Sequence, residues 1–189
     1  MSFWVMLASF APWVVFKVTA HLPFTNPLTG IKIAMALSTA VCVWQAMRDK
    51  TRGIIYWGSI AFFAFGFVSV VLLTNMWVIF HLGWLSQLQL TILSFGSMAF
   101  RRPFTIAYAK QHVPQSLWTA PGFIRKNYLI TGIWSLAFAV GLATEIMRAR
   151  HMGITGVQIE FVDDIAMLAA MIFTSIYSRR PAPEEHRAA

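Results

Sequence analysis

Six long apolar stretches, separated by polar connections, run through this chain of 189 residues. A helix needs about 20 apolar residues to cross a hydrocarbon layer about 30 Å thick, and each stretch is near that length. We therefore predict an all-α protein, a polytopic bundle of six transmembrane helices. The predicted spans are residues 3–20, 28–47, 54–73, 76–100, 127–147 and 161–177.

The connections between the stretches contain residues that stop helices. The two-residue turn Thr74-Asn75 is so short that the spans on either side must form an antiparallel hairpin. Asn75 and Asn127 stand at the starts of spans, where we expect them to cap the helices. The organisation predicted is one transmembrane domain, residues 1–178, followed by a short polar tail, residues 179–189.

The basic residues predict the orientation of the bundle, because cytoplasmic connections are enriched in Lys and Arg. With both termini in the cytoplasm, the outer side holds only Arg148 and Arg150. The cytoplasmic side then holds all the other basic residues outside the spans: Arg48, Lys50, Arg52, Arg101, Arg102, Lys110, Arg125, Lys126, Arg179, Arg180 and Arg187. We therefore predict an N-in, C-in topology.

Composition supports a membrane location. Hydrophobic residues make up 58% of the chain and charged residues 12%, whereas about a quarter of a soluble protein is charged. The net charge of +8 is explained by cytoplasmic Lys and Arg that attract anionic lipid headgroups, so we expect no nucleic-acid partner. The one cysteine, Cys42, permits neither a disulfide framework nor a cysteine-based metal site.

Ionisable side chains inside the predicted spans gather in the outer half of the membrane. Because charge in hydrocarbon is costly, we expect each of them to have a structural or functional role. This intramembrane polar cluster consists of Lys17, Lys32, His81, Glu145, Asp163 and Asp164. Since cations and carboxylates lie at matching depth, we predict that one of the two lysines pairs with one of the three carboxylates. Two interpretations stay open. Salt bridges and snorkelling lysines fix the order of the helices, or the cluster lines a water-filled vestibule that binds an anionic or protonatable ligand.

Other polar residues point to structure rather than to chemistry. Gln87 and Gln89 lie in the middle of the fourth span, and because they are two residues apart only one can face a given neighbour. We expect an interhelical hydrogen bond there. A haem bound by two histidines would need His21 as the partner of His81, and His21 lies in a turn. No zinc-site spacing, phosphate-binding loop or nucleophile motif occurs, so we expect no metal, no cofactor and no catalytic residue.

The longest connection, residues 101–126, is basic and aromatic, and prolines divide it. The piece from Phe104 to His112 is predicted to form two turns of helix along the cytoplasmic membrane surface, with aromatic rings in the headgroups and basic groups at lipid phosphates. The predicted lipid or partner surface consists of Arg101, Arg102, Phe104, Tyr108, Lys110, Trp118, Arg125 and Lys126. It serves either as an anchor or as a docking surface for another protein.

Several short motifs are spread along the chain. The first span contains a proline and ends in a lysine, PWVVFK, from Pro12 to Lys17, and the last span closes with FTSIY, from Phe173 to Tyr177. Between them lie the basic cluster Arg48 to Arg52, Phe65-Gly66, the turn Asn75 to Trp77, the stop Arg101 to Pro103, and Asn127. In these elements, which cover nearly the whole chain, the sequence resembles the intracellular septation protein A family of small bacterial inner-membrane proteins. The resemblance implies a role in cell-envelope upkeep and division through contacts with other membrane proteins, and it implies no catalytic residues.

The leading hypothesis is a non-enzymatic protein of the bacterial inner membrane that acts through contacts with lipids, other membrane proteins or further copies of itself. A small transporter or channel that uses the intramembrane polar cluster is the first alternative. A membrane-embedded lipid-modifying enzyme, with His81 and the acidic residues as candidates, is the second.

Overall fold

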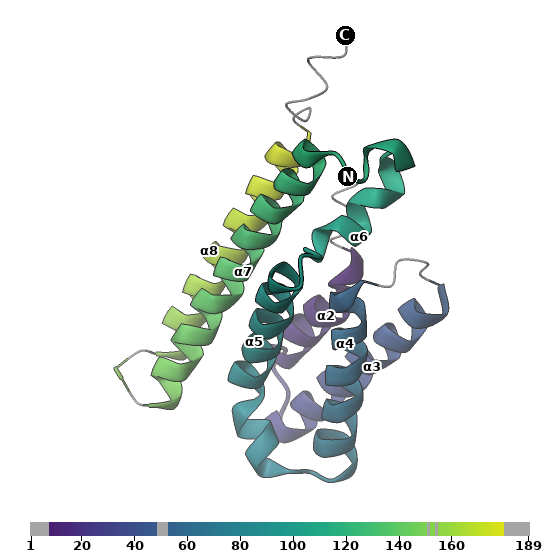
Figure 1. Cartoon of the computed structure of the whole chain (residues 1–189). Helices are drawn as coiled ribbons and strands as arrows, with labels where there is room; N and C mark the ends of the chain where they lie inside the picture. The colour runs from purple at the N-terminus through teal and green to yellow at the C-terminus, as the bar shows by residue number, and fades with distance from the viewer. Residues whose placement is uncertain (1–7, 49–52, 151, 154, 180–189) are drawn as a thin grey trace. The chain divides into compact units, whose positions relative to one another are not determined.

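The computed structural model describes residues 8–48, 53–150, 152–153 and 155–179, with all of their side chains except that of His112. These residues are helical, and no strand occurs among them. They fall into two compact units (Figure 1). The N-terminal unit extends to Ser86 and the C-terminal unit starts at Gln87. Each unit is described by itself, and the prediction of a single domain over residues 1–178 stays a prediction.

The N-terminal unit contains α2 (Ala11–Ala20), α3 (Pro27–Arg48), α4 (Ile54–Gly66) and the first half of α5 (Met76–Ala99). Asn75 begins α5 as predicted, because its side-chain oxygen accepts a hydrogen bond from the backbone N–H of Val78 at 3.2 Å. The basic cluster expected after α3 falls on residues 49–52, which lie outside the described part of the chain.

The last turns of the third predicted span form a π-helix, η1 (Phe67–Leu72), that continues α4. The segment ends at Thr74, whose φ of 48° lies in the left-handed region. That conformation is costly for a β-branched residue, but it turns the chain sharply and lets the Asn75 N–H reach the carbonyl of Ser69 at 2.7 Å. The sequence pattern did not predict the π-helix.

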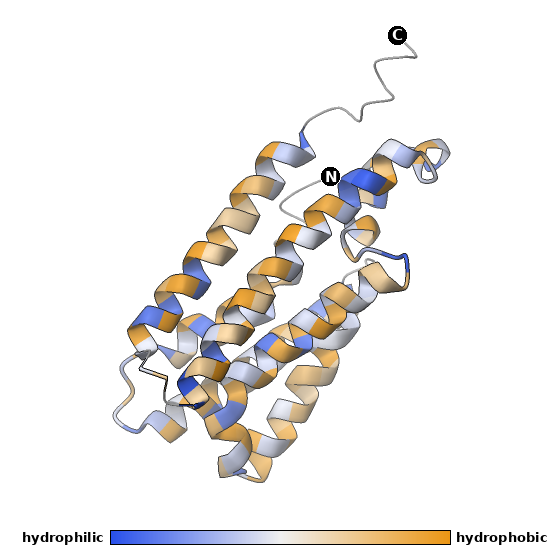
Figure 2. Cartoon of the chain, turned by 60° about the vertical axis from the view of Figure 1, so that its left-hand side comes forward, coloured by the Kyte–Doolittle hydropathy of each residue, from blue (hydrophilic) through white to orange (hydrophobic). Residues whose placement is uncertain are grey.

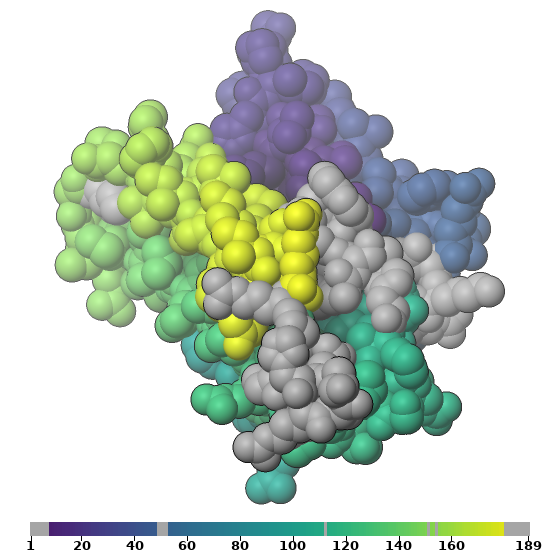
Figure 3. Space-filling model, turned by 90° about the horizontal axis from the view of Figure 1, so that it is seen from above, coloured from purple at the N-terminus to yellow at the C-terminus, as the bar shows by residue number. Residues whose placement is uncertain are grey.

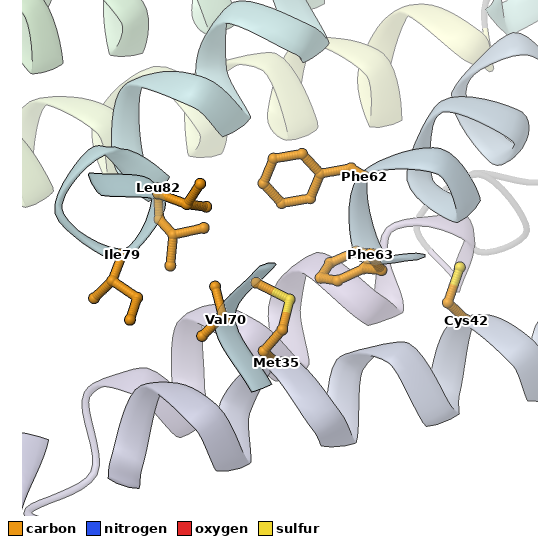
Figure 4. Packing of buried hydrophobic residues seen from close by; sticks show 8 residues of the cluster. Met35, Cys42, Phe62, Phe63, Val70, Ile79 and Leu82 are labelled. Atoms are coloured by element: carbon orange, nitrogen blue, oxygen red, sulfur yellow. The ribbon is translucent and has the colours of Figure 1, made fainter. Parts of the chain in front are cut away.

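The core of the N-terminal unit consists of apolar side chains from α3, α4, η1 and α5 (Figure 4). Met35, Phe63 and Val70 are fully buried. A Cβ added at Gly66 would lie 2.6 Å from the sulfur of Met35, so the end of the Met35 side chain on α3 rests against the backbone of α4 at this glycine. In a membrane such close packing holds helices together, because lipid tails are as apolar as the side chains themselves.

The C-terminal unit contains the second half of α5, the short helix α6 (Thr105–Ala109), the 3-10 turns η2 (Lys110–His112) and η3 (Gln115–Leu117), and the long helices α7 (Pro121–Ala149) and α8 (Gly156–Ser178). The predicted two-turn helix in the long connection is confirmed as α6 and η2. Both long helices begin earlier than predicted: α7 starts with a proline at its first turn, and α8 starts with a capping box made by Thr155 and Gln158.

Helices α7 and α8 lie side by side in an antiparallel pair (Figures 1 and 3). Small residues face the contact: Ala137 is 5% exposed, Ala170 is 1% exposed, and Gly141 is buried. A buried hydrogen bond from the Trp134 indole N–H to the hydroxyl of Thr174, 2.9 Å long, also joins the pair. Close backbone approach and an interhelical hydrogen bond are the two devices that hold membrane helices together.

Four stretches of helix in the described part of the chain are long and apolar enough to cross a membrane: α3, the continuous α4–η1 segment (Ile54–Leu72), α5 and α7. Figure 2 shows that the helices are largely orange or pale along their length. Helices α2 and α8 occupy the positions of the first and last predicted spans but are not in this set. The described part of the chain is thus all-helical, with four helices that are long and apolar enough to span a membrane. Six spans with N-in, C-in orientation stay predictions.

Candidate functional site

The predicted intramembrane polar cluster divides between the two units. Its basic members, Lys17, Lys32 and His81, belong to the N-terminal unit, and its three carboxylates belong to the C-terminal unit. Since each unit is described by itself, the predicted pairing of a lysine with a carboxylate stays a prediction. The contacts within each unit define the surroundings of most of these side chains.

Lys32 stabilises the end of another helix. Its ammonium group donates a hydrogen bond to the hydroxyl of Thr74 at 2.6 Å, directly after the π-helix η1. The carbonyls at a helix C-terminus carry partial negative charge, so a cation is favoured there. Lys32 is only partly buried. These contacts favour the structural interpretation of this lysine.

His81 is held within a group of aromatic rings on α5. Its Nδ1 lies 2.6 Å from the carbonyl oxygen of Trp77. The imidazole stacks on the Trp77 ring with centroids 4.4 Å apart, and its edge faces Trp84 at 5.9 Å. These contacts fix the orientation of the ring by groups on its own helix. Indoles prefer the headgroup level of a bilayer, which suits a histidine near the end of a span.

Glu145 pairs within its own helix. Arg148, one turn later on α7, donates to one carboxylate oxygen of Glu145 at 2.6 Å and 3.1 Å. The arginine side chain is 46% exposed, and exposed pairs of this kind contribute about 0.2–1 kcal/mol. The pair neutralises Glu145 at the end of α7 but does not join two helices.

Asp163 on α8 is different, because it takes part in a contact among three helices. Its carboxylate oxygen Oδ1 accepts a hydrogen bond from the side-chain amide of Gln87 on α5 at 2.9 Å. The predicted interhelical hydrogen bond from the middle of α5 is thereby confirmed. We call Asp163, Gln87 and Gly141 of α7 the three-helix polar site.

Gly141 makes room for this hydrogen bond. A Cβ at residue 141 would lie 2.6 Å from Gln87 Nε2 and 2.7 Å from Asp163 Oδ1, distances that real Cβ atoms do not show. Both polar side chains therefore rest against the backbone of α7. The hydroxyl of Thr144, one turn further on, donates a hydrogen bond to the carbonyl of Gly141 at 2.9 Å. The α7 backbone beside Gln87 and Asp163 is therefore itself hydrogen bonded.

The depth of the three-helix polar site makes it costly. Gln87 lies about 16 Å along α5 from Met76, close to the middle of the helix. A charged side chain at such a depth costs about 2.5–3.5 kcal/mol on insertion scales. Two further oxygen atoms here are buried and make no hydrogen bond with any described residue: Oε1 of Gln87 and the hydroxyl of Thr91, one turn later on α5. Buried polar atoms usually have partners.

The other acidic residues of α8 lie apart from this contact. Asp164, predicted as part of the intramembrane polar cluster, and Glu160 are both exposed. Neighbouring positions on a helix point in different directions, so Asp163 and Asp164 face different surroundings. The hydrogen bond from Gln87 goes to Asp163, and the predicted cluster as a whole stays a prediction.

Two aromatic residues of the predicted lipid surface are buried. Phe104 is 2% exposed and Tyr108 is 1% exposed, so the prediction that their rings dip into headgroups is wrong. The reason is that α6 packs against α7, where the hydroxyl of Thr105 lies 2.9 Å from that of Thr131 and 3.0 Å from the carbonyl of Asn127.

Asn127 also corrects a prediction. It was expected to cap the fifth helix, but it lies inside α7, is 2% exposed, and donates its side-chain amide to the carbonyl of Phe123 at 2.8 Å. Because α7 begins at Pro121, the helix start needs no capping side chain at residue 127.

The basic residues of that surface fall into two groups. Arg101, Arg102 and Arg125 are exposed. Lys110 lies over the Trp118 ring at 4.6 Å from its centroid, and Lys126 donates to the carbonyl of Ser178 at 2.8 Å. The last contact places a cation at the C-terminus of α8, where the helix dipole favours it.

Sequence reasoning missed Gly141 as a part of the three-helix polar site. As a small residue four positions after Ala137, it has a spacing typical of helix packing, which carries no signal for a polar contact. The combination of a mid-span glutamine with a carboxylate near the start of a later span was the one available signal.

Within the described residues, no group of three or more His, Cys, Asp and Glu side chains is placed to hold a metal ion. Comparison with known protein families, with curated proteins and with solved structures finds no match.

Proposed function

We propose that this chain is an integral protein of the bacterial inner membrane that acts without catalysis, through contacts of its helices with lipids and other membrane proteins. We further propose that these contacts serve the upkeep and division of the cell envelope. The location in a membrane is supported by the helices themselves, and the link to division by the resemblance to the septation protein A family.

The observation that carries the proposal is the apolar outer face of the helices. On α3 the exposed side chains follow one helical stripe, from Ile33 through Leu37 and Trp44 to Met47, which is 74% exposed. Polar side chains such as Ser38 point inward and are buried. A surface of this kind is stable only against hydrocarbon or against another apolar protein surface.

Helix α8 carries the same kind of stripe although it contains three acidic residues. Its large exposed apolar side chains lie three or four residues apart: Val157, Phe161, Ile165, Leu168, Ile172 and Ile176. The exposed polar side chains Gln158, Glu160 and Asp164 are confined to its first third. From the first to the last the stripe covers about 28 Å along the axis, close to the thickness of the hydrocarbon layer. This pattern supports α8 as a further spanning helix.

The exposed arginines support contact with lipid headgroups. Arg101 ends α5 in the left-handed conformation, with φ 56°, and the Arg102 N–H reaches back to the carbonyl of Ser97 at 2.8 Å. This Schellman ending directs two basic residues out of the helix at one level. Such clusters beside a span attract anionic lipids.

Site-specific photocrosslinking tests the proposed contacts. A photoreactive amino acid at the exposed positions Leu37 and Ile172 is expected to yield adducts with specific membrane proteins in growing cells. The same amino acid at buried Ala170 serves as the matched control on α8 and is expected to yield none. Cells that lack the chain are expected to be elongated or to have leaky envelopes, and the wild-type gene should restore them. Normal division and permeability, together with lipid adducts alone at every outward position, would exclude this function.

A small cation transporter is the second candidate, and the three-helix polar site favours it. A carboxylate held by an amide within a span is a common element of ion pathways. Purified chain in sealed liposomes would then carry cations down a gradient, and Asp163→Asn would abolish the flux while Asp164→Asn would preserve it. Equal flux in protein-free liposomes and in liposomes with the chain would exclude transport.

A further inference from the structure

We propose that the C-terminal unit binds one anionic phospholipid at the place where α5 ends and α7 begins, with the lipid phosphate between Arg101 and Arg125. We call these two residues the arginine corner. This site rests on the proposed contact of the helices with lipids, and it adds the class of lipid and the residues that select it.

Backbone and side-chain contacts bring the two arginines to one corner although they are far apart in the sequence. The carbonyl oxygen of Met98 accepts a hydrogen bond from the backbone N–H of Arg101 at 3.0 Å and from the hydroxyl of Tyr128 at 3.3 Å. Arg125 lies one turn before Tyr128 on the same face of α7. Because an arginine side chain is about as long as that of tyrosine, Arg125 is long enough to reach the end of α5.

The arginine corner has no negative group of its own among the described residues. The side chains of Arg101 and Arg125 are exposed and make no hydrogen bond or ion pair with any residue that the structure describes. The described carboxylates of this unit lie in the first half of the antiparallel helix α8 and at Glu145, about 30 Å further along α7 than Arg125. Two uncompensated guanidinium groups at one place attract an anion from outside the chain.

Exposed apolar side chains beside each arginine favour a lipid over a soluble anion. Phe100, directly before Arg101, is 80% exposed, and Leu129, one turn after Arg125 on α7, is 44% exposed. Both lie on the side of the arginines toward the apolar helices α5 and α7. An amphiphile fits both kinds of surface, because its phosphate binds guanidinium groups while its acyl chains cover the apolar side chains.

The charge of the corner favours an anionic headgroup over a zwitterionic one. Arginine binds a phosphate through two parallel hydrogen bonds, and here two arginines approach one phosphate from two helices. An ammonium group on the same headgroup would be repelled by them and by the exposed Arg102 beside them. A glycerol headgroup carries no such charge, so phosphatidylglycerol is the probe that matches the site.

Arg179 provides a matched control at the same end of the unit. Lys126 donates a hydrogen bond to the carbonyl of Ser178 at 2.8 Å, which places the end of α8, and Arg179 after it, beside Lys126. Since neighbouring positions on a helix point in different directions, Arg125 and Arg179 lie on different sides of α7. Arg179 is also exposed, so it carries the same charge without belonging to the arginine corner.

Native mass spectrometry of the purified full-length chain tests this site. The chain is released from detergent micelles that contain phosphatidylglycerol and phosphatidylethanolamine with identical acyl chains, and the lipids that stay bound are counted over a range of lipid concentrations. One phosphatidylglycerol per chain is expected to bind with saturation. It should bind about 30-fold more tightly than phosphatidylethanolamine, because each of the two arginines strengthens the binding of an anionic lipid about fivefold.

Matched variants assign the binding to the arginine corner. Arg101→Gly, which suits the backbone conformation at φ 56°, and Arg125→Gln should each weaken the binding of phosphatidylglycerol about fivefold, and the two together about 30-fold. Arg179→Gln removes the same charge and should change the affinity less than about twofold. Leu129→Gln should weaken the binding, and glycerol phosphate, which lacks acyl chains, should not displace the lipid. Circular dichroism checks the helix content of every variant.

Three results would overturn the site. One is equal binding of phosphatidylglycerol and phosphatidylethanolamine, which would leave the proposed function standing because adducts with membrane proteins test that function separately. Another is an equal loss of affinity in Arg125→Gln and Arg179→Gln, since the attraction would then belong to the basic end of the unit as a whole. The third is displacement by glycerol phosphate, which would make the ligand a soluble phosphate rather than a lipid.

Discussion

Replacement of Gly141 by alanine is the most direct test of the three-helix polar site. The added methyl group would lie 2.6 Å from Gln87 Nε2 and 2.7 Å from Asp163 Oδ1, well inside the ordinary contact distance. Both neighbours are the ends of flexible side chains, so they can move, but making room for the methyl group disturbs the 2.9 Å hydrogen bond that joins them.

The magnitude follows from three terms. Overpacking of a close-packed interior costs about 1–3 kcal/mol. Loss of a hydrogen bond to a charged group costs about 1.5–3 kcal/mol. Alanine is favoured over glycine inside a helix by about 1 kcal/mol. The expected net loss in the free energy of unfolding is therefore about 1.5–5 kcal/mol, or about 2–4 °C in the midpoint for each kcal/mol.

Gly132 provides the matched control on the same helix. A Cβ there meets only the terminal methyl of Met98, at an ordinary 3.8 Å. Gly132→Ala should therefore stabilise the protein by about 0.4–1 kcal/mol. The assay is reversible unfolding in mixed micelles or thermal unfolding in nanodiscs, with the two variants measured side by side.

A double mutant tests the cause of the loss. If the methyl group acts by displacing Gln87, then Gly141→Ala should cost much less in a Gln87→Ala background, since the space is already free. The reasoning is refuted if Gly141→Ala unfolds like Gly132→Ala, or if the Gln87→Ala background leaves its cost unchanged.

Three further predictions concern other contacts. Lys32→Met should lower the free energy of unfolding by about 1.5–3 kcal/mol, because it removes a charged donor from Thr74. In the same unfolding assay, the double mutant Lys32→Met with Thr74→Val should be at least as stable as the less stable of the two single mutants. Trp134→Phe should lower the free energy of unfolding by about 1–3 kcal/mol, because the buried hydroxyl of Thr174 loses its donor at 2.9 Å. If Trp134→Phe costs the same free energy in a Thr174→Val background, the hydrogen bond is not the cause. Arg101→Gly should leave the fold intact and raise the midpoint slightly, since φ 56° suits glycine, whereas binding to vesicles with anionic lipid should weaken.

The sequence determined the helices and most of their ends. Apolar length alone predicted helical stretches in the places where α3, α5 and α8 lie, because a segment buried in lipid must satisfy its backbone hydrogen bonds internally. The ends were marked by residues such as Asn75, whose side chain caps α5 at 3.2 Å. The early starts of α7 and α8 have local signals too, a proline and a capping box, which lie outside the apolar stretches from which the spans were predicted.

The tertiary structure alone decided which polar residues meet. Charges of opposite sign at similar depth predict that one of two lysines pairs with one of three carboxylates, and that pairing stays a prediction. The hydrogen bond from Gln87 to Asp163 within the C-terminal unit is what the structure adds. The depth of a residue can be read from a sequence, but the direction in which it points depends on which helices are neighbours. Small residues such as Gly141 help to determine which helices pack together. The role of Gly141 is visible only in the structure, because it depends on the atoms of α5 and α8 that lie against it.

Packing between helices also explains why two aromatic residues of the long connection are buried. Phe104 and Tyr108 stand among basic residues, which is typical of a headgroup surface, but they are almost fully buried. Their burial depends on Thr105, which bonds to α7 through Thr131. The sequence thus determined that this protein is built from membrane helices, whereas the packing of one helix on another decided where its polar chemistry lies, because only close contact makes two distant residues neighbours.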